Sequence, residues 1–383
     1  MLYLLLILIS TSCMLHAQDS TEVSRFSYKG YIKNLQTVSL YDDADYSISS
    51  NMFHNRFSCS YDITENLSLR ADMRNRLFWG EMSKVNAGFE QSINTRPGLM
   101  GLSETIFNTS GILLHSMLDR IAITYKPQGW NITFGRQRIN WGVHTVWNPN
   151  DIFNTYNLLD FDYEERPGCD ALRIQKLYDN STIEFAMKPD TTIKSSIAAL
   201  LFKTNYEGYD IQLLAGMYKE DYIIGTGWAG NIGEAGFKGE CSYFTPIEHN
   251  VNKKNSVSLS LMLDQTFADN WYCSIGALYN STVNLQQSLF TLQSNALSPK
   301  QIFPFETTFY VGINKQLSPI NTIGCTVLYS PTNYALILMP LITYNIAENI
   351  DIDFISQSFF AQKDDGEYSN LATSIFFRSR WSF

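Results

Sequence analysis

The chain ends in the stretch LATSIFFRSRWSF, Leu371 to Phe383. Side chains of a β-strand alternate between its two faces. The even positions of the stretch include two arginines, Arg378 and Arg380. The odd positions are mostly apolar and aromatic: Leu371, Thr373, Ile375, Phe377, Ser379, Trp381 and Phe383. The pattern predicts a strand with one face toward an apolar surrounding and the other toward water.

The same alternation recurs along the chain, most clearly from Ser256 to Gln265. Leucines and a valine share one face there, and serines share the other. An outward Leu261 and an inward Ser260 predict that Leu261→Arg destabilises the protein, whereas Ser260→Arg is tolerated. Helical spacing at i, i+3 and i+4 does not fit such segments.

Composition favours a membrane β-barrel over a soluble domain. Charged residues make up only 17% of the chain, against about 25% in a typical soluble domain, and aromatic residues make up 14%. Beyond the N-terminal region, no apolar run approaches the roughly 20 residues of a membrane helix. The terminal strand resembles the last strand of bacterial outer-membrane barrels. We therefore predict an all-β fold, a single transmembrane antiparallel up-and-down barrel of about 18 strands, with 16 or 14 as alternatives.

The N-terminal residues 1–18 are typical of a cleaved signal peptide, because a short apolar run precedes small and polar residues. A lipoprotein modified at Cys13 is the less favoured alternative. Residues 19–383 are expected to form the barrel, with long external loops near 80–116, 140–169 and 280–303. We expect an integral protein of the outer membrane of a Gram-negative cell envelope, in contact with its lipids and inserted by the barrel-assembly machinery.

The segment FGRQRINWGVHTVWNPNDIF, Phe134 to Phe153, resembles a GRQ…WG…NP pattern in a family of porin-like outer-membrane proteins. The resemblance implies a channel-type barrel and names no solute. The physical interpretation is a strand that ends near Arg138, followed by an aromatic loop that folds inward. Anchoring of the barrel at the membrane interface by Trp141 and Trp147 is the equally weighted alternative. The matching residues are Gly135, Arg136, Gln137, Trp141, Gly142, Asn148 and Pro149.

Charged residues on the expected inward faces separate by sign. We predict a basic wall on contiguous strands: Arg25, Lys29, Arg56, Arg70, Arg74, Arg76, Arg120, Arg136, Arg138, Arg378 and Arg380. We predict an opposite acidic wall: Glu184, Asp210, Glu240, Asp264, Glu306, Asp351 and Asp353. Such walls would set up a field across the lumen and select ions.

The loop at 140–169 is the candidate constriction of the pore. Its acids could also neutralise the basic wall and close the channel. The residues proposed for this loop are Trp141, Trp147, Asn148, Asp160, Asp162, Glu164, Glu165 and Arg166.

Motifs for catalysis or cofactors are sparse. The mature chain has no HExxH, GxSxG or CxxC pattern, so we expect no enzyme activity, no cofactor and no metal site. A net charge of −9 argues against a nucleic-acid partner. The leading hypothesis is a porin-like channel for passive diffusion of small polar solutes, anionic or of mixed charge. The alternative is a plugged barrel that binds a surface glycan or a protein, or assists assembly.

Overall fold

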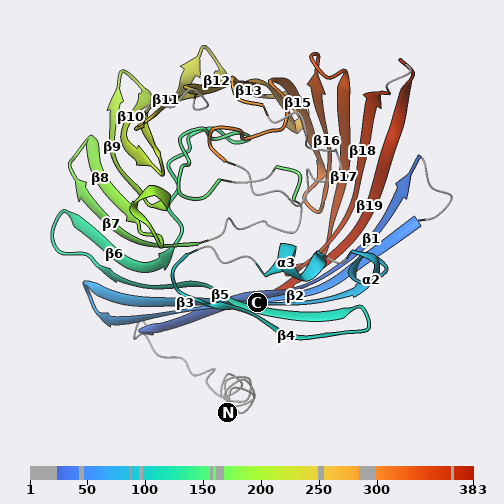
Figure 1. Ribbon diagram of the computed structural model, residues 1–383, viewed down its shortest axis with the longest axis horizontal. Coiled ribbons are helices and arrows are strands. Elements are labelled where there is room, and N and C mark those ends of the chain that lie inside the picture. The colour runs from blue at the N-terminus through green and yellow to red at the C-terminus, as the bar shows by residue number, and fades with distance from the viewer. Residues whose placement is uncertain are drawn as a thin grey trace.

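The structure is a computed structural model that describes residues 24–42, 47–86, 88–94, 98–155, 158–160, 168–248, 254–283, 298–363 and 366–383 (Figure 1). The expected signal peptide lies outside these ranges. So do four residues of the expected constriction: Asp162, Glu164, Glu165 and Arg166.

Nearly all regular structure in the described residues is β-strand. The strands in the first half of the chain are β1 (Phe26–Tyr41), β2 (Ser47–Thr64), β3 (Leu67–Gly80), β4 (Ser103–Thr109), β5 (Ile112–Tyr125), β6 (Trp130–Gln137), β7 (Cys169–Leu177), β8 (Ser181–Lys188) and β9 (Ile197–Tyr206). The later strands are β10 (Tyr209–Tyr218), β11 (Asp221–Ile232), β12 (Ala235–Pro246), β13 (Ser256–Phe267), β14 (Trp271–Asn280), β15 (Thr307–Ser318), β16 (Asn321–Ser330), β17 (Ala335–Ala347), β18 (Ile350–Gln362) and β19 (Tyr368–Ser382). The short helical elements are α2 (Met82–Val85), α3 (Phe89–Ile93), η1 (Ile193–Ser195) and η2 (Ala268–Asn270).

The strands form one closed antiparallel ring. Of the 19 strands in the sheet, β4 pairs only with β5, and β3 also pairs with β5, so 18 strands complete the circle. The ring closes where β19 pairs with β1, with Arg380 opposite Lys33. Gly30 and Phe383 exchange two backbone hydrogen bonds of 2.9 Å at this seam. The predicted all-β barrel of about 18 strands is confirmed, and the terminal strand is the one that closes it.

The two faces of the wall differ as the alternation predicts. In β13, Val257 and Leu263 point outward, whereas Ser256, Ser258 and Ser260 point inward and are buried. Large exposed hydrophobic side chains cover the outer face around the ring. Because the core of this molecule lies inside the ring, the inward side chains decide what the barrel can do.

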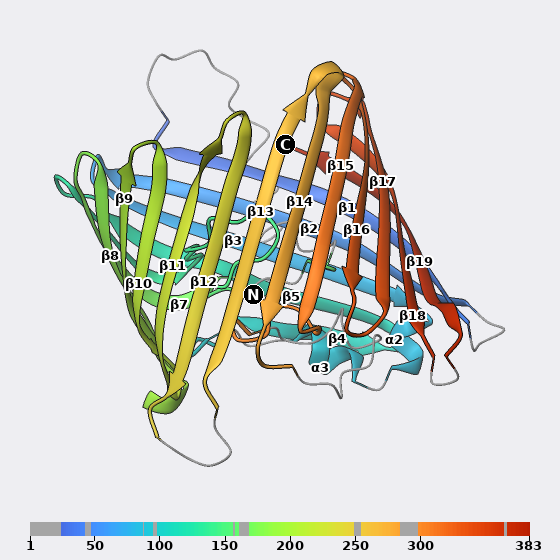
Figure 2. The same cartoon turned by 90° about the horizontal axis from the view of Figure 1, so that it is seen from above.

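Connections differ at the two ends of the barrel. At the end that holds the C-terminus and the start of β1, neighbouring strands join through short turns such as 207–208 and 233–234. At the other end, β3 and β5, β6 and β7, and β14 and β15 are joined by the long connections 81–111, 138–168 and 281–306, of which the structure describes only part (Figure 2). Among the described residues, no helix is long and apolar enough to cross a membrane.

Candidate functional site

An arginine wall lines the inner face of β2, β3 and β5, and comprises Arg56, Arg70, Arg74, Arg76 and Arg120. Arg56 is buried, and its guanidinium donates to Asp72 at 2.9 Å and to Asp119 at 2.6 Å. Arg70 donates to both oxygens of Asp72, at 3.0 and 2.9 Å, and Arg120 lies 3.7 Å from the same carboxylate. Asp72 therefore holds three guanidinium groups in one cluster.

Asp119 enters this cluster through a bulge that we did not predict. The β3–β5 register shifts between Asp72 and Met73, so that consecutive residues Asp119 and Arg120 both face inward. The signal was present in the sequence, because the apolar stripe of residues 113–124 changes parity at this point. Inward positions of β2, β3 and β5 carry five arginines against three aspartates (Asp62, Asp72 and Asp119), which leaves an excess of two positive charges.

One member of the arginine wall, Arg76, contacts the long connection that precedes β5. Arg76 donates to the Ile93 carbonyl at 3.3 Å and lies 3.4 Å from Nδ1 of His115. A guanidinium is a donor only, so Nδ1 accepts and the proton sits on Nε2. Nε2 then donates to Oγ of Ser103 at 2.9 Å, and that hydroxyl donates to Asn94 at 2.8 Å. The contact between His115 and Ser103 therefore holds the connection before β5 in place. Because the histidine donates to the serine, it is not placed as the base that would activate a nucleophile.

The second basic pair, on β19, is wrongly placed in the predicted charge map. Arg378 donates to Asp353 at 2.8 Å, and Arg380 donates to Asp351 at 2.8 Å. These aspartates were expected on an opposite acidic wall, but β18 is the strand next to β19. Because each positive charge meets a carboxylate on its neighbouring strand, the two signs are not separated across the lumen here.

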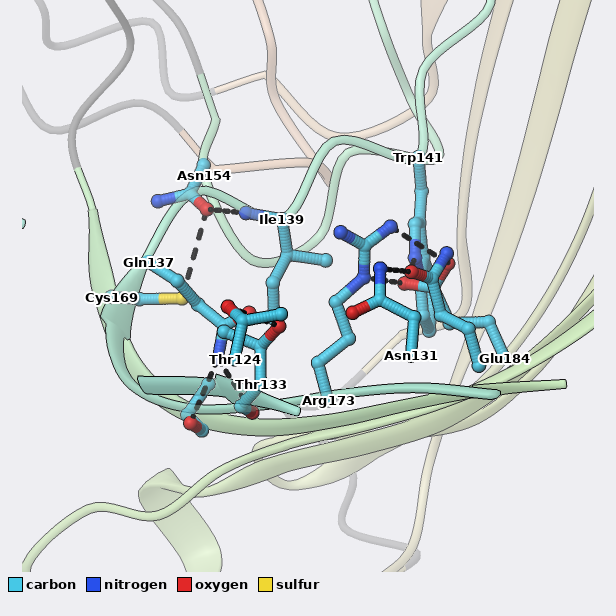
Figure 3. Close-up of polar contacts among 12 residues, drawn as sticks. Thr124, Asn131, Thr133, Gln137, Ile139, Trp141, Asn154, Cys169, Arg173 and Glu184 are labelled. Atoms are coloured by element: carbon cyan, nitrogen blue, oxygen red, sulfur yellow. Dashed lines mark hydrogen bonds and ion pairs between the residues drawn. The ribbon is translucent and has the colours of Figure 1, made fainter. Parts of the chain in front are cut away.

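The remaining predicted acids have different environments. Glu184 of β8 is buried and bonded by Arg173 at 2.6 and 2.9 Å (Figure 3). Asp264 of β13 pairs with Lys238 of β12 at 3.0 Å. Asp210 is exposed near a short turn and accepts from Asn205, and Glu306 is exposed outside the strands. The predicted acids therefore do not form a continuous wall.

Arg136 does not line the lumen, contrary to prediction. It has the same parity as Trp130 and Phe134, which point outward and are exposed. Its guanidinium donates to Asp170 of β7 at 2.7 and 3.1 Å and to the Met100 carbonyl at 2.6 Å, and it is fully buried. The rule that charges point inward fails here because residues 98–102 cover the pair.

The other predicted basic residues lie at the margins of the wall. Arg138 follows the last residue of β6 and is half-buried, at the point where the chain leaves the sheet. Arg25 precedes β1 and Lys29 lies near its start, and both are exposed at the end with the short turns. They do not join the five arginines of the arginine wall.

The connection after β6 folds into the lumen, as one of the two alternatives predicted. Glu240 of β12 is fully buried and accepts hydrogen bonds from three backbone amides of this segment, Val143 at 2.5 Å, His144 at 2.8 Å and Asn150 at 2.9 Å. Figure 1 shows this segment inside the ring, and we call its described residues, 138–155 and 158–160, the inserted loop. Sequence reasoning placed Glu240 in the lumen but missed that it binds backbone.

Both tryptophans of the inserted loop are buried inside the barrel, which rules out the interface-anchor alternative. The Trp141 indole donates to Glu184 at 2.6 Å (Figure 3). The Trp147 ring packs against Phe303 and Tyr310, with centroids 6.0 and 6.1 Å apart. Residues 302–305 of the connection after β14 join the same apolar cluster, a contribution that we did not predict.

Backbone conformation and close packing explain why two positions of the GRQ…WG…NP segment are glycine. Gly135 has a φ of +118°, and a Cβ there would lie 2.4 Å from the Ile121 carbonyl oxygen. A Cβ on Gly142 would collide with the side chain of Asn148, which belongs to the NP part of the same motif. Asn148 is buried in the inserted loop, and Asp160 is half-buried near its end. The motif therefore shapes how the chain leaves the wall and turns inside it.

The inserted loop also closes over part of the wall that was expected to be open. Ser260 points inward as predicted, but it is fully buried and its hydroxyl donates to the Trp147 carbonyl at 3.1 Å. An arginine at position 260 would displace the loop, so the expectation that Ser260→Arg is tolerated is wrong. In this half of the barrel, a side chain that points into the lumen is therefore not necessarily exposed to water.

No protein-family model matches the sequence, and no curated protein matches it significantly. Solved structures with the same fold include Acinetobacter baumannii OccAB4, with a TM-score of 0.61 at 9% identity over 95% of this chain and 100% of that chain. A. baumannii OccAB3 aligns with a TM-score of 0.58 at 11% identity over 94% and 100%. Pseudomonas aeruginosa OpdK, solved with vanillate, aligns with a TM-score of 0.54 at 7% identity over 93% and 99%. At these identities the likeness establishes the fold, which is that of the Occ and Opd outer-membrane porins.

Proposed function

We propose that this protein is an outer-membrane channel for passive diffusion of small polar solutes that are anionic or of mixed charge. The observation that carries the proposal is the arginine wall inside a closed barrel, placed across the ring from the strands that hold the inserted loop. A polar interior and an apolar outer face are the arrangement of a membrane barrel that conducts solutes.

The preference for anions follows from the charge count. The inward positions of β2, β3 and β5 retain two positive charges beyond their aspartates. A wall with more guanidinium groups than carboxylates raises the local concentration of anions and lowers the barrier to their entry. The OpdK structure contains vanillate, whose carboxylate belongs to the same chemical class as the solute proposed here.

Export and insertion are part of the proposal. A chain whose outer face is apolar has to reach the outer membrane with its N-terminal signal removed and be inserted by the barrel-assembly machinery. Its lasting partners are then the outer-membrane lipids, and its transient partner is the solute.

Planar-bilayer recording under a salt gradient tests the proposal. We expect stepwise openings and a reversal potential that indicates anion preference, which should weaken as the salt concentration rises. Arg70→Gln removes one inward charge from a half-exposed side chain while Arg56 and Arg120 still hold Asp72. This change should reduce the anion preference.

Lys315→Gln is the matched control, because it removes one positive charge from the outer face, where Lys315 lies 4.6 Å from the Trp271 ring. It should leave the reversal potential unchanged. Cation preference in the unmodified channel would contradict the choice of solute. A folded barrel that never conducts would instead favour the plugged, surface-binding alternative.

A further inference from the structure

The outer face of β1, β2, β3 and β5 carries a band of uncharged polar side chains in otherwise apolar surroundings. We call this band the amide row; it consists of Asn34, Gln36, Asn51, Asn55, Asn75 and Ser116. Each has the outward parity of its strand, and each is half-buried. The four strands lie side by side along the lower edge of the ring in Figure 1.

Hydrogen bonds link the amide row across strand boundaries. The Ser116 hydroxyl donates to Asn75 at 2.8 Å, and the Asn75 amide donates to Asn55 at 3.4 Å. Asn55 in turn donates to the Tyr31 carbonyl at 3.4 Å, and Gln36 donates to Asn34 at 2.6 Å. Asn51 lies directly opposite Gln36 in the β1–β2 register. The residues therefore form two neighbouring groups, Ser116 with Asn75 and Asn55, and Gln36 with Asn34 and the facing Asn51, and are not isolated polar substitutions.

The amide row lies within the apolar band and not at its rim. Asn55 stands between Phe53 and Phe57 on the outer face of β2, and Asn75 stands between Met73 and Leu77 on β3. Ser116 is flanked in the same way on β5. Across the ring, the corresponding outward positions are apolar or cysteine on β13 to β16, as in Leu259, Leu261, Val311 and Cys325.

Lipid tails cannot answer the hydrogen-bonding groups that remain on these side chains. Each amide nitrogen has two hydrogens, and the bonds described above use one hydrogen on Asn55 and one on Asn75. A polar group left unsatisfied in hydrocarbon is costly. Asn and Gln both donate and accept, so the amide row is complementary to a second copy of itself, as a twofold interface requires.

We propose that the amide row is the contact surface between two copies of this protein in the membrane. Hydrogen bonds between polar side chains are the directional attraction available between membrane segments, where lipid removes the hydrophobic driving force. The opposite outer face, on β13 to β16, is built mainly from aliphatic and aromatic side chains and faces lipid. This inference depends on the barrel lying in a bilayer and not on which solute passes through it.

Site-specific photo-crosslinking of the full mature barrel in phosphatidylcholine vesicles tests the proposal. Replacement of Phe53 by p-benzoylphenylalanine places a crosslinker between Asn51 and Asn55, on a side chain that is 43% exposed. Replacement of Phe309 is the matched control, on β15 across the ring and 47% exposed. We expect a crosslinked dimer from position 53 and none from position 309.

The combined change Asn55→Leu with Asn75→Leu should then weaken association. Each side-chain hydrogen bond between membrane segments changes the association constant by roughly threefold. Four bonds across a twofold dimer therefore predict a loss on the order of 80-fold. Thr226→Val removes an outward polar group on β11 and should leave association intact. Absence of a crosslink at position 53, equal crosslinking at both positions, or a dimer that the leucine changes do not weaken would each overturn the proposal.

Discussion

The two halves of the barrel interior use buried carboxylates in different ways. In the arginine wall, Asp72 is bonded by guanidinium groups of its own and neighbouring strands. In the loop-lined half, the inner faces of β8 to β18, Glu240 is bonded by three backbone amides of the inserted loop. The first arrangement fixes side chains along the wall, and the second fixes a segment of chain across the lumen. What an inward acid does is therefore decided by its partner and not by its position on the ring.

The same comparison suggests how the interior is divided between structure and passage. Apolar side chains of the loop-lined half pack on the inserted loop, as Met262 and Leu278 do near Trp147. The inward residues of β2, β3 and β5 are largely charged or polar. We expect substitutions in the loop-lined half to alter how much of the lumen is filled. Substitutions in the arginine wall should alter barrel stability and ion preference.

The largest effect is expected when the inserted loop loses its anchor. Glu240→Ala removes three hydrogen bonds to a carboxylate, each contributing about 1.5–3 kcal/mol, so loop docking should lose roughly 5 kcal/mol. The strands should remain paired, because the loop contributes no strand to the ring. We expect a larger and noisier single-channel conductance and faster proteolysis within residues 138–160.

Asp210→Ala is the control for this change, since Asp210 is an exposed inward acid of the same half that contacts no loop residue in the described part of the chain. Its conductance should match that of the unmodified protein. If Glu240→Ala conducts and resists protease as the unmodified protein does, the loop is held by its other contacts, such as the Trp141–Glu184 and Ser260–Trp147 hydrogen bonds and its apolar packing.

The next effect concerns the arginine wall and should appear in the stability of the whole barrel. Arg56→Met leaves the buried carboxylates Asp72 and Asp119 without their shared guanidinium. Breaking a buried ion pair from one side costs about 3–5 kcal/mol. Urea unfolding in lipid vesicles should therefore show a clear loss of stability.

Arg70→Met tests whether burial is the reason for that loss. Arg70 binds the same Asp72 but is 45% exposed, and exposed ion pairs contribute about 0–1 kcal/mol. Equal losses from the two substitutions would show that the contact with Asp72, not its burial, determines stability.

Alternation, together with composition and the resemblance of the last strand, was enough to predict the barrel, its approximate strand number and the inward orientation of most arginines. It was not enough where the regular pleat is interrupted. The bulge at Asp119 and Arg120 reverses parity within β5, and the outward Arg136 is hidden by residues 98–102. The placement of Asp351 and Asp353 failed for another reason, because the parity of a strand says which face a charge is on but not which neighbour it meets. Partners across strands depend on register, which the single sequence did not fix.

The inserted loop also shows that the single sequence did not identify which distant residues become partners. Its aromatic residues and its length indicated an inward fold, yet the residue that holds it, Glu240, lies about 90 positions away, as the Asn150 contact shows. A carboxylate that binds backbone amides has no partner that can be recognised by residue type. The glycines Gly135 and Gly142 were the local signals that the chain must turn sharply there.

A pH-dependent effect of intermediate size is expected in the inserted loop. Nδ1 of His144 accepts from the Val146 and Trp147 amides at 3.0 and 3.2 Å, so the docked loop requires a neutral ring. The pKa of His144 is lowered from 6.5 to about 4, chiefly by burial and to a smaller extent by Lys238, while the Leu261 backbone and the charge of Asp264 oppose the shift. Docking should be complete above pH 6.5 and lose about 3 kcal/mol as the pH falls to 4.

Proteolysis of the loop at pH 7.5, 5.5 and 4 measures this loss. His144→Asn offers an amide oxygen as acceptor and does not titrate, so its cleavage rate should depend less on pH. If the unmodified loop is equally protected at pH 7.5 and pH 4, protonation of His144 is not coupled to docking.

The smallest effect is expected from the half-exposed ion pair between β18 and β19. Arg380 and Asp351 lie on β19 and β18 at 2.8 Å, but their side chains are 31% and 21% exposed, so water screens the pair. We expect Arg380→Gln to cost less than about 1 kcal/mol in urea unfolding. A double-mutant cycle with Asp351→Asn isolates the interaction and should give a coupling energy of similar size. The backbone bonds between Gly30 and Phe383 join β19 to its other neighbour, β1, and remain in every variant of the cycle. A coupling energy as large as the loss in Arg56→Met would mean that ion pairs near the mouth stabilise the barrel as strongly as those buried in the arginine wall, and the distinction drawn here between the two would fail.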